Sequence, residues 1–148
     1  MADAEKPDFL DPDYTDIFTE RAARLKRIRL DESWHLVKRY YADGNYVEFI
    51  EDWLTTYDPR LSARGKPTTV PLILFPRLEE YVRWLYARKH LGEDGVVAKS
   101  RDMGISVVTL AFALCEWLFA PGVKMSFGSR KEDLVDKMGN PDCLLEKI

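Results

Sequence analysis

The sequence predicts an α/β fold class, with a helical N-terminal region followed by an incomplete phosphate-loop βαβ unit with parallel strands. Two observations indicate this unit. A short stretch rich in valine, 95–98, leads through a basic turn that contains glycine into a long apolar helix, 105–119. Residues 123–127 then alternate between apolar and polar side chains, as a half-buried strand does. A strand–helix–strand order normally forms a right-handed crossover between parallel strands.

The first third of the chain is predicted to be helical, over residues 14–29, 32–42 and 45–56. Asn45 follows a break at Asp43-Gly44 and suits the N-cap of the third helix. Prolines and a glycine between residues 58 and 71 then indicate a connector. We therefore divide the chain into a helical region, a connector and an α/β part, at residues 1–60, 61–70 and 71–148.

The α/β part begins with the extended apolar segment 71–75 and a helix whose first turn contains Pro76. Gly92 is placed to end that helix. The next helix, 105–119, carries Glu116 as its only charge, so we expect it to be buried between a sheet and another layer. A further helix is predicted around residues 130–138.

Composition excludes several classes of protein. The 148 residues are 46% hydrophobic and 32% charged with a net charge of −3, a balance typical of folded domains. No apolar run is long enough to span a membrane, and the acidic N-terminus has no signal core, so we expect a cytoplasmic protein with no membrane partner. Cys115 and Cys143 are far apart, and Cys115 is expected to be a buried free thiol. His35 and His90 are the only histidines, which argues against a structural zinc site.

Charge is unevenly distributed near the N-terminus. Residues 21–29 contain five basic side chains and no acidic one. One interpretation is a helix face that contacts nucleic-acid phosphates. The alternative is a solvated outer face on a helix that buries the apolar stripe Phe18, Ala22, Leu25 and Ile28.

The turn before helix 105–119 resembles a phosphate-binding loop in its order of elements. Compared with the pattern G-x-x-x-x-G-K-[ST], Gly104 and Ser106 match, Ile105 replaces the lysine, and Lys99 replaces the first glycine. In such a loop Gly104 allows the backbone to approach phosphates, and the N–H groups from Met103 to Ser106 hold their oxygens. The Ser106 hydroxyl is suited to ligate Mg²⁺, and the long Lys99 side chain can reach the β- and γ-phosphates.

Arg101 adds a delocalised positive charge that can stabilise a transferring phosphoryl group, so it is the candidate catalytic residue. The expected cofactors are ATP and Mg²⁺, with Ser106 as the metal ligand. The candidate cofactor-binding residues are Lys99, Ser100, Met103, Gly104, Ile105 and Ser106.

The segment 99–106 resembles the deviant Walker A loop of the large terminase subunit of tailed bacteriophages, in which the lysine often stands first. Residues 71–77 resemble the segment that precedes the adenine-binding motif of that family. Residues 127–136 and 140–148 resemble the passage that follows its Walker A helix. The resemblance therefore covers the second half of the chain, 71–148.

The resemblance implies an N-terminal portion of an ATP-driven motor that packages double-stranded DNA into a capsid within the bacterial host. It also implies double-stranded DNA, the small terminase subunit and the portal as partners, and homo-oligomers are possible. Two departures follow from the residues. Leu78 stands where the family commonly has a glutamine that recognises adenine. No Walker B strand follows residue 127, so we expect a truncated ATPase domain that does not hydrolyse ATP by itself.

Two other functions are compatible with the sequence. The N-terminal helices alone are compatible with an assembly or DNA-contacting module, since four aromatic residues there suit either a partner surface or the helical core. These aromatic residues are Trp34, Tyr40, Tyr41 and Trp53. A small-molecule kinase is disfavoured, because the sequence shows neither a lid nor a Walker B strand.

Overall fold

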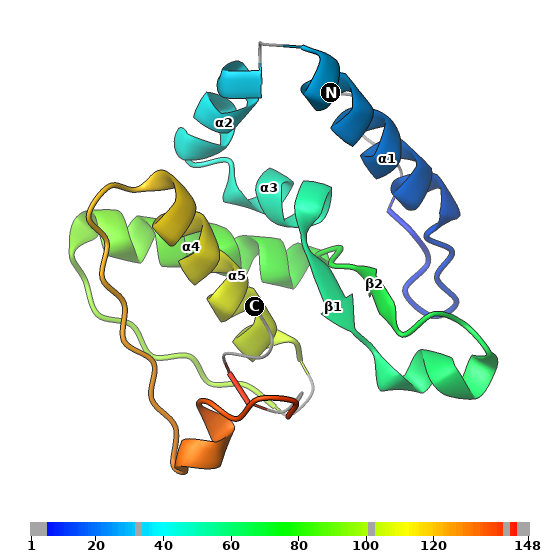
Figure 1. The fold of residues 1–148 in the computed structure, drawn as a ribbon. Helices are drawn as coiled ribbons and strands as arrows, with labels where there is room; N and C mark the ends of the chain where they lie inside the picture. Colours follow the sequence, from blue (N-terminus) through cyan, green and yellow to red (C-terminus); the bar gives the residue numbers. More distant parts are fainter. Residues whose placement is uncertain (1–5, 32–33, 101–102, 141–142, 145–148) are drawn as a thin grey trace.

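A computed structural model describes residues 6–31, 34–100, 103–140 and 143–144, and this part of the chain is mostly helical (Figure 1). Its longer helices are α1 (Thr15–Leu30), α2 (Trp34–Ala42), α3 (Tyr46–Trp53), α4 (Pro76–Leu91) and α5 (Ile105–Phe119). Two short strands and two 3-10 turns complete it: β1 (Thr55–Tyr57), η1 (Pro59–Arg64), β2 (Thr69–Pro71) and η2 (Glu132–Leu134).

The predicted parallel βαβ unit is wrong. Neither 95–98 nor 123–127 forms a strand, and the sheet seen in the described residues is the antiparallel pair β1–β2. Residues 95–100 are exposed throughout, and so is most of 121–128. A parallel strand needs hydrogen-bonded neighbours and cover on both faces, and these segments have neither within the described residues. The helix predicted at 130–138 is also wrong, because only the 3-10 turn η2 forms there.

The antiparallel hairpin formed by β1 and β2 begins directly after α3. The predicted helix 45–56 stops at Trp53, and the β-branched pair Thr55-Thr56 continues as β1. Thr55 pairs with Pro71, and the Leu72 amide donates to the Leu54 carbonyl at 2.9 Å. This pairing brings the residues that follow the connector back against α3.

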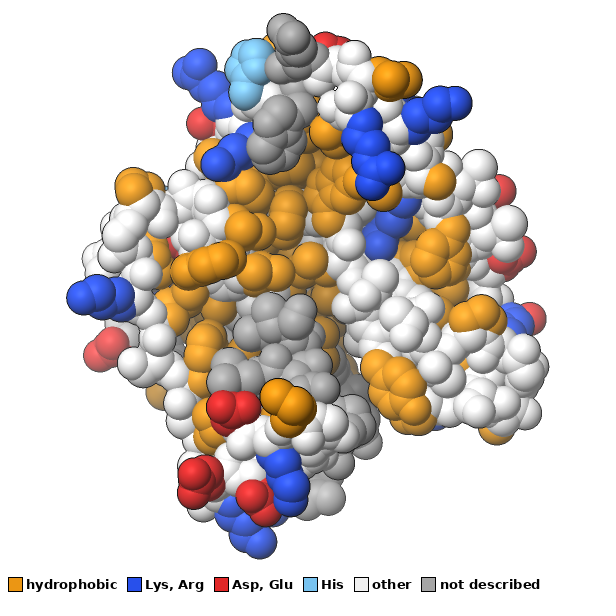
Figure 2. All heavy atoms as spheres, in the orientation of Figure 1, with side chains coloured by type: hydrophobic (Ala, Val, Ile, Leu, Met, Phe, Trp, Pro, Cys, Tyr) orange, Lys and Arg blue, Asp and Glu red, His pale blue; other side chains and the backbone are white. Residues whose placement is uncertain are grey.

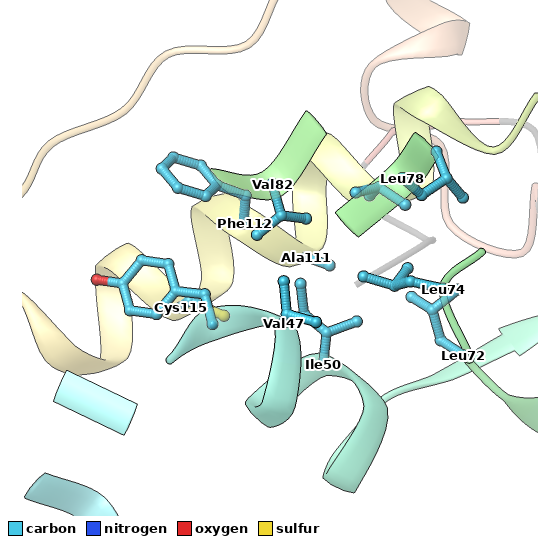
Figure 3. Close-up of a cluster of buried hydrophobic side chains, with 11 residues drawn as sticks. Val47, Ile50, Leu72, Leu74, Leu78, Val82, Ala111, Phe112 and Cys115 are labelled. Atoms are coloured by element: carbon cyan, nitrogen blue, oxygen red, sulfur yellow. The ribbon is translucent and has the colours of Figure 1, made fainter. Parts of the chain in front are cut away.

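The core joins α3, the segment after β2, α4 and α5. Figure 3 shows Val47 and Ile50 of α3 facing Ala111 of α5 and Val82 of α4. Ile50 and Val108 are fully buried, and burial of such a side chain contributes about 1.5–3 kcal/mol. The expectation that helix 105–119 packs on a sheet is therefore corrected: α5 packs against α2, α3 and α4. Cys115 is a buried free thiol, as predicted.

Helix α1 is attached to this core by polar contacts. Its one buried residue is Arg21, which donates to the Leu54 carbonyl at 2.9 Å and to the Glu51 carbonyl. Arg24 forms an ion pair with Asp52 and lies 5.5 Å from the centre of the Trp53 ring. The alternative that α1 buries a stripe formed by Phe18, Ala22, Leu25 and Ile28 is wrong.

Exposure of that stripe is substantial, since Phe18 is 44% exposed and Leu25 is 45% exposed. Ala22 is exposed as well, and Ile28 is half-buried. The reason is that the carbonyls at the end of α3 attract the guanidinium of Arg21, and this turns a different face of α1 toward the core.

A buried ion pair joins α4 to α5. Glu116 is 1% exposed, and one of its carboxylate oxygens accepts a hydrogen bond from Lys89. The other oxygen, Oε1, has no hydrogen-bond partner within the described residues. Burial and the neighbouring Glu116 carboxylate raise the pKa of Tyr46 well above its usual value. In the described part of the chain, no helix combines the length and apolar character needed to cross a membrane.

Candidate phosphate-binding site

The start of α5 has the backbone geometry of an anion site. Gly104 is its N-cap with φ +72°, a left-handed conformation that glycine adopts readily and other residues rarely do. The Gly104 carbonyl accepts the first helical bond, from the Val108 amide at 3.0 Å. The amides of residues 105–107 precede that bond, and no side chain among the described residues caps the helix start. Three N–H groups and the positive end of a 15-residue helix therefore face the loop.

Helix α4 holds this first turn in place. A Cβ placed on Gly104 would lie 3.5 Å from Cδ1 of Leu78, so α5 begins against the start of α4. The Tyr81 hydroxyl lies 2.9 Å from the hydroxyl of Thr109, which in turn donates to the Ile105 carbonyl at 2.8 Å. Ile105 itself packs against the core. The first turn of α5 is thus fixed from two sides.

The predicted site residues divide into two groups. Gly104, Ile105 and Ser106 share the first turn of α5, and the half-buried Ser106 has no side-chain hydrogen-bond partner within the described residues. Lys99 and Ser100 lie in an exposed segment without regular structure, where the Lys99 ammonium donates to the Ser100 carbonyl at 3.4 Å.

Of the two remaining site residues, the structure describes Met103. Met103, directly before the N-cap, is 42% exposed. The prediction for Arg101 falls outside the described residues.

The segment 71–77, which resembles the passage before the adenine-binding motif, leads to a residue that borders the start of α5. Leu72 and Leu74 are buried in the core, and the chain then enters α4 at Pro76, as predicted. Leu78 is 4% exposed and contacts the Gly104 position. An apolar, buried side chain offers no hydrogen bond to a base. Position 78 therefore does not supply an adenine-recognising amide.

Metal binding depends on a small donor set. Among the residues that the structure describes, no three His, Cys, Asp or Glu side chains gather in a way that suits a metal ion. A Mg²⁺ ion at Ser106 would take its other ligands from nucleotide phosphates and water, which is a common arrangement for this cation.

An ion cluster at the start of α4 was not predicted from the sequence. The Lys6 ammonium donates to Glu51 at 2.8 Å, to the Leu74 carbonyl at 2.6 Å, and to Glu79. Partial burial opposes ionisation of Glu79, yet hydrogen bonds from Lys6 and Arg83 lower its pKa. The only sequence signal was the acidic first turn after Pro76. These bonds hold the start of α4 in place, and α5 begins against that part of α4.

The N-terminal aromatic residues serve different roles. Tyr41 is buried, donates to Asp52 at 2.6 Å, and accepts from the Trp53 ring nitrogen at 2.9 Å. Trp53 is half-buried in the same network, whereas Tyr40 is 40% exposed. The side chain of Trp34 lies outside the described residues. Tyr41 and Trp53 are therefore interior residues, and Tyr40 remains on the surface.

Comparison with known proteins found no family model, no curated protein sequence and no solved structure that matches this chain. Its function is therefore proposed from its own residues and their geometry.

Proposed function

We propose that this chain binds the phosphates of a nucleotide at the start of α5, as part of an ATP-driven DNA-packaging motor similar to the large terminase subunit. One observation carries the proposal. Leu78, which directly follows the resembling segment 71–77, borders the start of α5, since a Cβ built on Gly104 would lie 3.5 Å from its Cδ1. A phosphate loop and the segment that borders the bound nucleotide need this proximity.

Each residue has a defined part in this proposal. The amides of residues 105–107 donate to phosphate oxygens, and the dipole of α5 adds to their attraction. Lys99 is exposed, and its ammonium makes only a long hydrogen bond, 3.4 Å, to the neighbouring Ser100 carbonyl, so the side chain is able to turn toward a triphosphate. The hydroxyl of Ser106 supplies an oxygen ligand for Mg²⁺. Arg101, by its chemistry, stabilises the transferring phosphoryl group.

Base selectivity is expected to be low. The buried Leu78 makes no hydrogen bond to an adenine edge, so phosphate contacts contribute most of the affinity. ATP and GTP should therefore bind with dissociation constants within about threefold of each other, a difference of less than 1 kcal/mol.

The experiment measures binding of a fluorescent ATP analogue to the purified chain in the presence of Mg²⁺. Lys99→Ala and Ser106→Ala are the test variants. Lys124→Ala is the matched control, because Lys124 is another exposed lysine on an irregular segment beyond α5. We expect Lys99→Ala to weaken binding about tenfold, the effect of losing one charge-assisted hydrogen bond, and Lys124→Ala to leave it unchanged. Equal affinities for all these variants would refute the site.

A second candidate function is a DNA-contacting or assembly module formed by the N-terminal helices. The observation that favours it is a cluster of exposed cations at the end of α1, Lys26, Arg27 and Arg29, which form no ion pair within the described residues. Affinity for duplex DNA across a salt series tests it, since each phosphate contact adds about 0.9 to the slope. A steep slope without nucleotide favours the module, whereas an ATP-dependent affinity favours the motor.

A further inference from the structure

Helix α1 presents an apolar stripe to solvent beside the face that holds it to α3. Phe18, Ala22, Leu25 and Arg29 recur at spacings of four, three and four residues, which is the spacing of a seam between two paired helices. Phe18 and Leu25 are each almost half exposed, although Arg21 on the adjacent face is buried. The stripe is therefore available to a partner while α1 stays attached.

A shallow apolar groove runs along the same side of α1. Its described lining consists of Ala22, Leu25, Lys26, Arg29 and Leu30, and most of that lining is hydrocarbon. Leu30 is 79% exposed. Lys26 and Arg29 lie beside the apolar side chains of this groove. A partner that binds here must therefore be apolar and carry acidic groups near one end.

Charge along α1 is sorted by end. The first six residues of α1 carry Asp16 and Glu20 with no basic residue. Residues 21–30 carry five basic residues with no acidic one, and three of them, Lys26, Arg27 and Arg29, form no ion pair within the described residues. Figure 2 shows Lys and Arg side chains at the end of α1 that adjoins α2, and acidic side chains toward its other end. A helix with this order is complementary to its own copy only when the copy runs in the opposite direction.

We propose that α1 pairs with α1 of a second copy of this chain, antiparallel and about a two-fold axis between residues 22 and 25. The acidic end of each helix then lies beside the basic end of the other, twice over. Ala22 packs on the partner's Leu25, and Phe18 packs on the partner's Arg29, whose guanidinium is suited to lie over an aromatic ring. This surface is separate from the start of α5, so its failure would leave the nucleotide proposal standing.

Two other occupants fit less well. A polyanion such as duplex DNA is attracted by the last two turns of α1 but repelled by Asp16 and Glu20 in its first two turns. It also gains nothing from the exposed hydrocarbon of Phe18 and Leu25. A parallel second copy sets acidic residues against acidic residues and basic against basic.

The dimer is expected to be weak. The 16 residues of α1 span about 24 Å, so the pair buries an area at the small end of specific interfaces. We therefore expect a dissociation constant on the order of 10–100 μM, with monomer at low and dimer at high concentration.

Sedimentation equilibrium at several concentrations tests the association. Leu25→Glu places a carboxylate in the seam of both copies and should give a monomer throughout, whereas Leu91→Glu should associate like the wild type. Leu91 is 62% exposed and lies outside α1, so it controls for adding a charge to an exposed leucine. Circular dichroism checks that each variant keeps its helices. A wild type that stays monomeric above about 500 μM overturns the proposal, as does equal association of all three proteins.

Cysteine cross-linking tests the direction of the helices. Near the two-fold axis, two copies of Ala22→Cys stand about 5 Å apart along the helix, whereas two copies of Phe18→Cys stand about 16 Å apart, beyond disulfide reach. Mild oxidation should cross-link Ala22→Cys and leave Phe18→Cys monomeric. The wild type is the background control, since Cys115 and Cys143 are both buried. Equal cross-linking of both variants means parallel helices and overturns the proposal.

Discussion

Removing the Lys89 ammonium should strongly destabilise the fold, because it leaves the buried Glu116 carboxylate without its cationic partner. Lys89 is the ion-pair partner of Glu116 among the described residues, and the Glu116 carboxylate is 1% exposed with Oε1 unpartnered. Lys89→Met keeps the aliphatic stem and removes only the ammonium. The remaining Glu116 carboxylate is 1% exposed and lies beside the Tyr46 hydroxyl, which carries no positive charge to replace the ammonium.

The magnitude follows from burial on each side of the pair. Breaking a fully buried pair from one side costs about 3–5 kcal/mol. The Lys89 side chain is 40% exposed, so solvent screens part of the interaction, and we expect about 2–3 kcal/mol for Lys89→Met. The double variant Lys89→Met/Glu116→Leu removes both charges and fills the space with hydrocarbon. It should unfold within about 1 kcal/mol of the wild type or be more stable.

Urea denaturation, followed by circular dichroism and tryptophan fluorescence, measures these free energies of unfolding. Arg77→Met is the control on the same helix, since Arg77 pairs with Glu80 on the surface, where both side chains are well exposed. That variant should lose less than about 0.5 kcal/mol. The reasoning fails if Lys89→Met loses no more than Arg77→Met, or if the double variant is as unstable as the single one.

Three further predictions concern the loop, the tyrosines and α1. Gly104→Ala, at φ +72°, should lower the free energy of unfolding by about 1–2 kcal/mol in thermal melts, and an unchanged melting temperature would contradict the left-handed N-cap. Burial raises the pKa of Tyr41 and Tyr46 above 10, so stability should be complete below pH 10 and fall as the pH rises beyond it. Their phenolate absorbance should then appear only as circular dichroism is lost, and its appearance in the folded protein would count against burial. Arg21→Ala removes charge-assisted bonds worth about 1.5 kcal/mol or more, so proteolysis within α1 should quicken about tenfold while the rest of the chain stays resistant. Uniform resistance would contradict the polar attachment.

Helix boundaries were largely predictable because their signals are local. Pro76 starts α4 and Gly92 ends it in a left-handed conformation, both as predicted. Asn45 occupies the N-cap of α3, but its side chain donates to the Tyr40 carbonyl at 2.7 Å instead of capping α3. The residue type was thus predictable, and the hydrogen bond was not, because α2 supplies the competing acceptor.

Strands were predicted wrongly because a strand needs a partner. Valines at 96 and 97 favour extended backbone locally, but Val96 is 96% exposed, and no strand of the described residues pairs with this segment. Thr55 and Thr56 became a strand, because the connector returns the segment 69–71 to their edge. Neither three-residue strand contains a local sequence signal that predicts its pairing with the other.

For the candidate site, the order of Gly104, Ile105 and Ser106 before an apolar run determined that a helix begins there with open amides. For α1, the sequence alone determined that a helix forms and that its acidic residues precede its basic ones. Only the tertiary structure decided that Leu78 borders Gly104 and that Arg21, instead of Phe18 or Leu25, faces the core. Amide geometry and charge order are set by neighbouring residues along the chain. Which face is buried depends on acceptors about thirty residues away, at the end of α3.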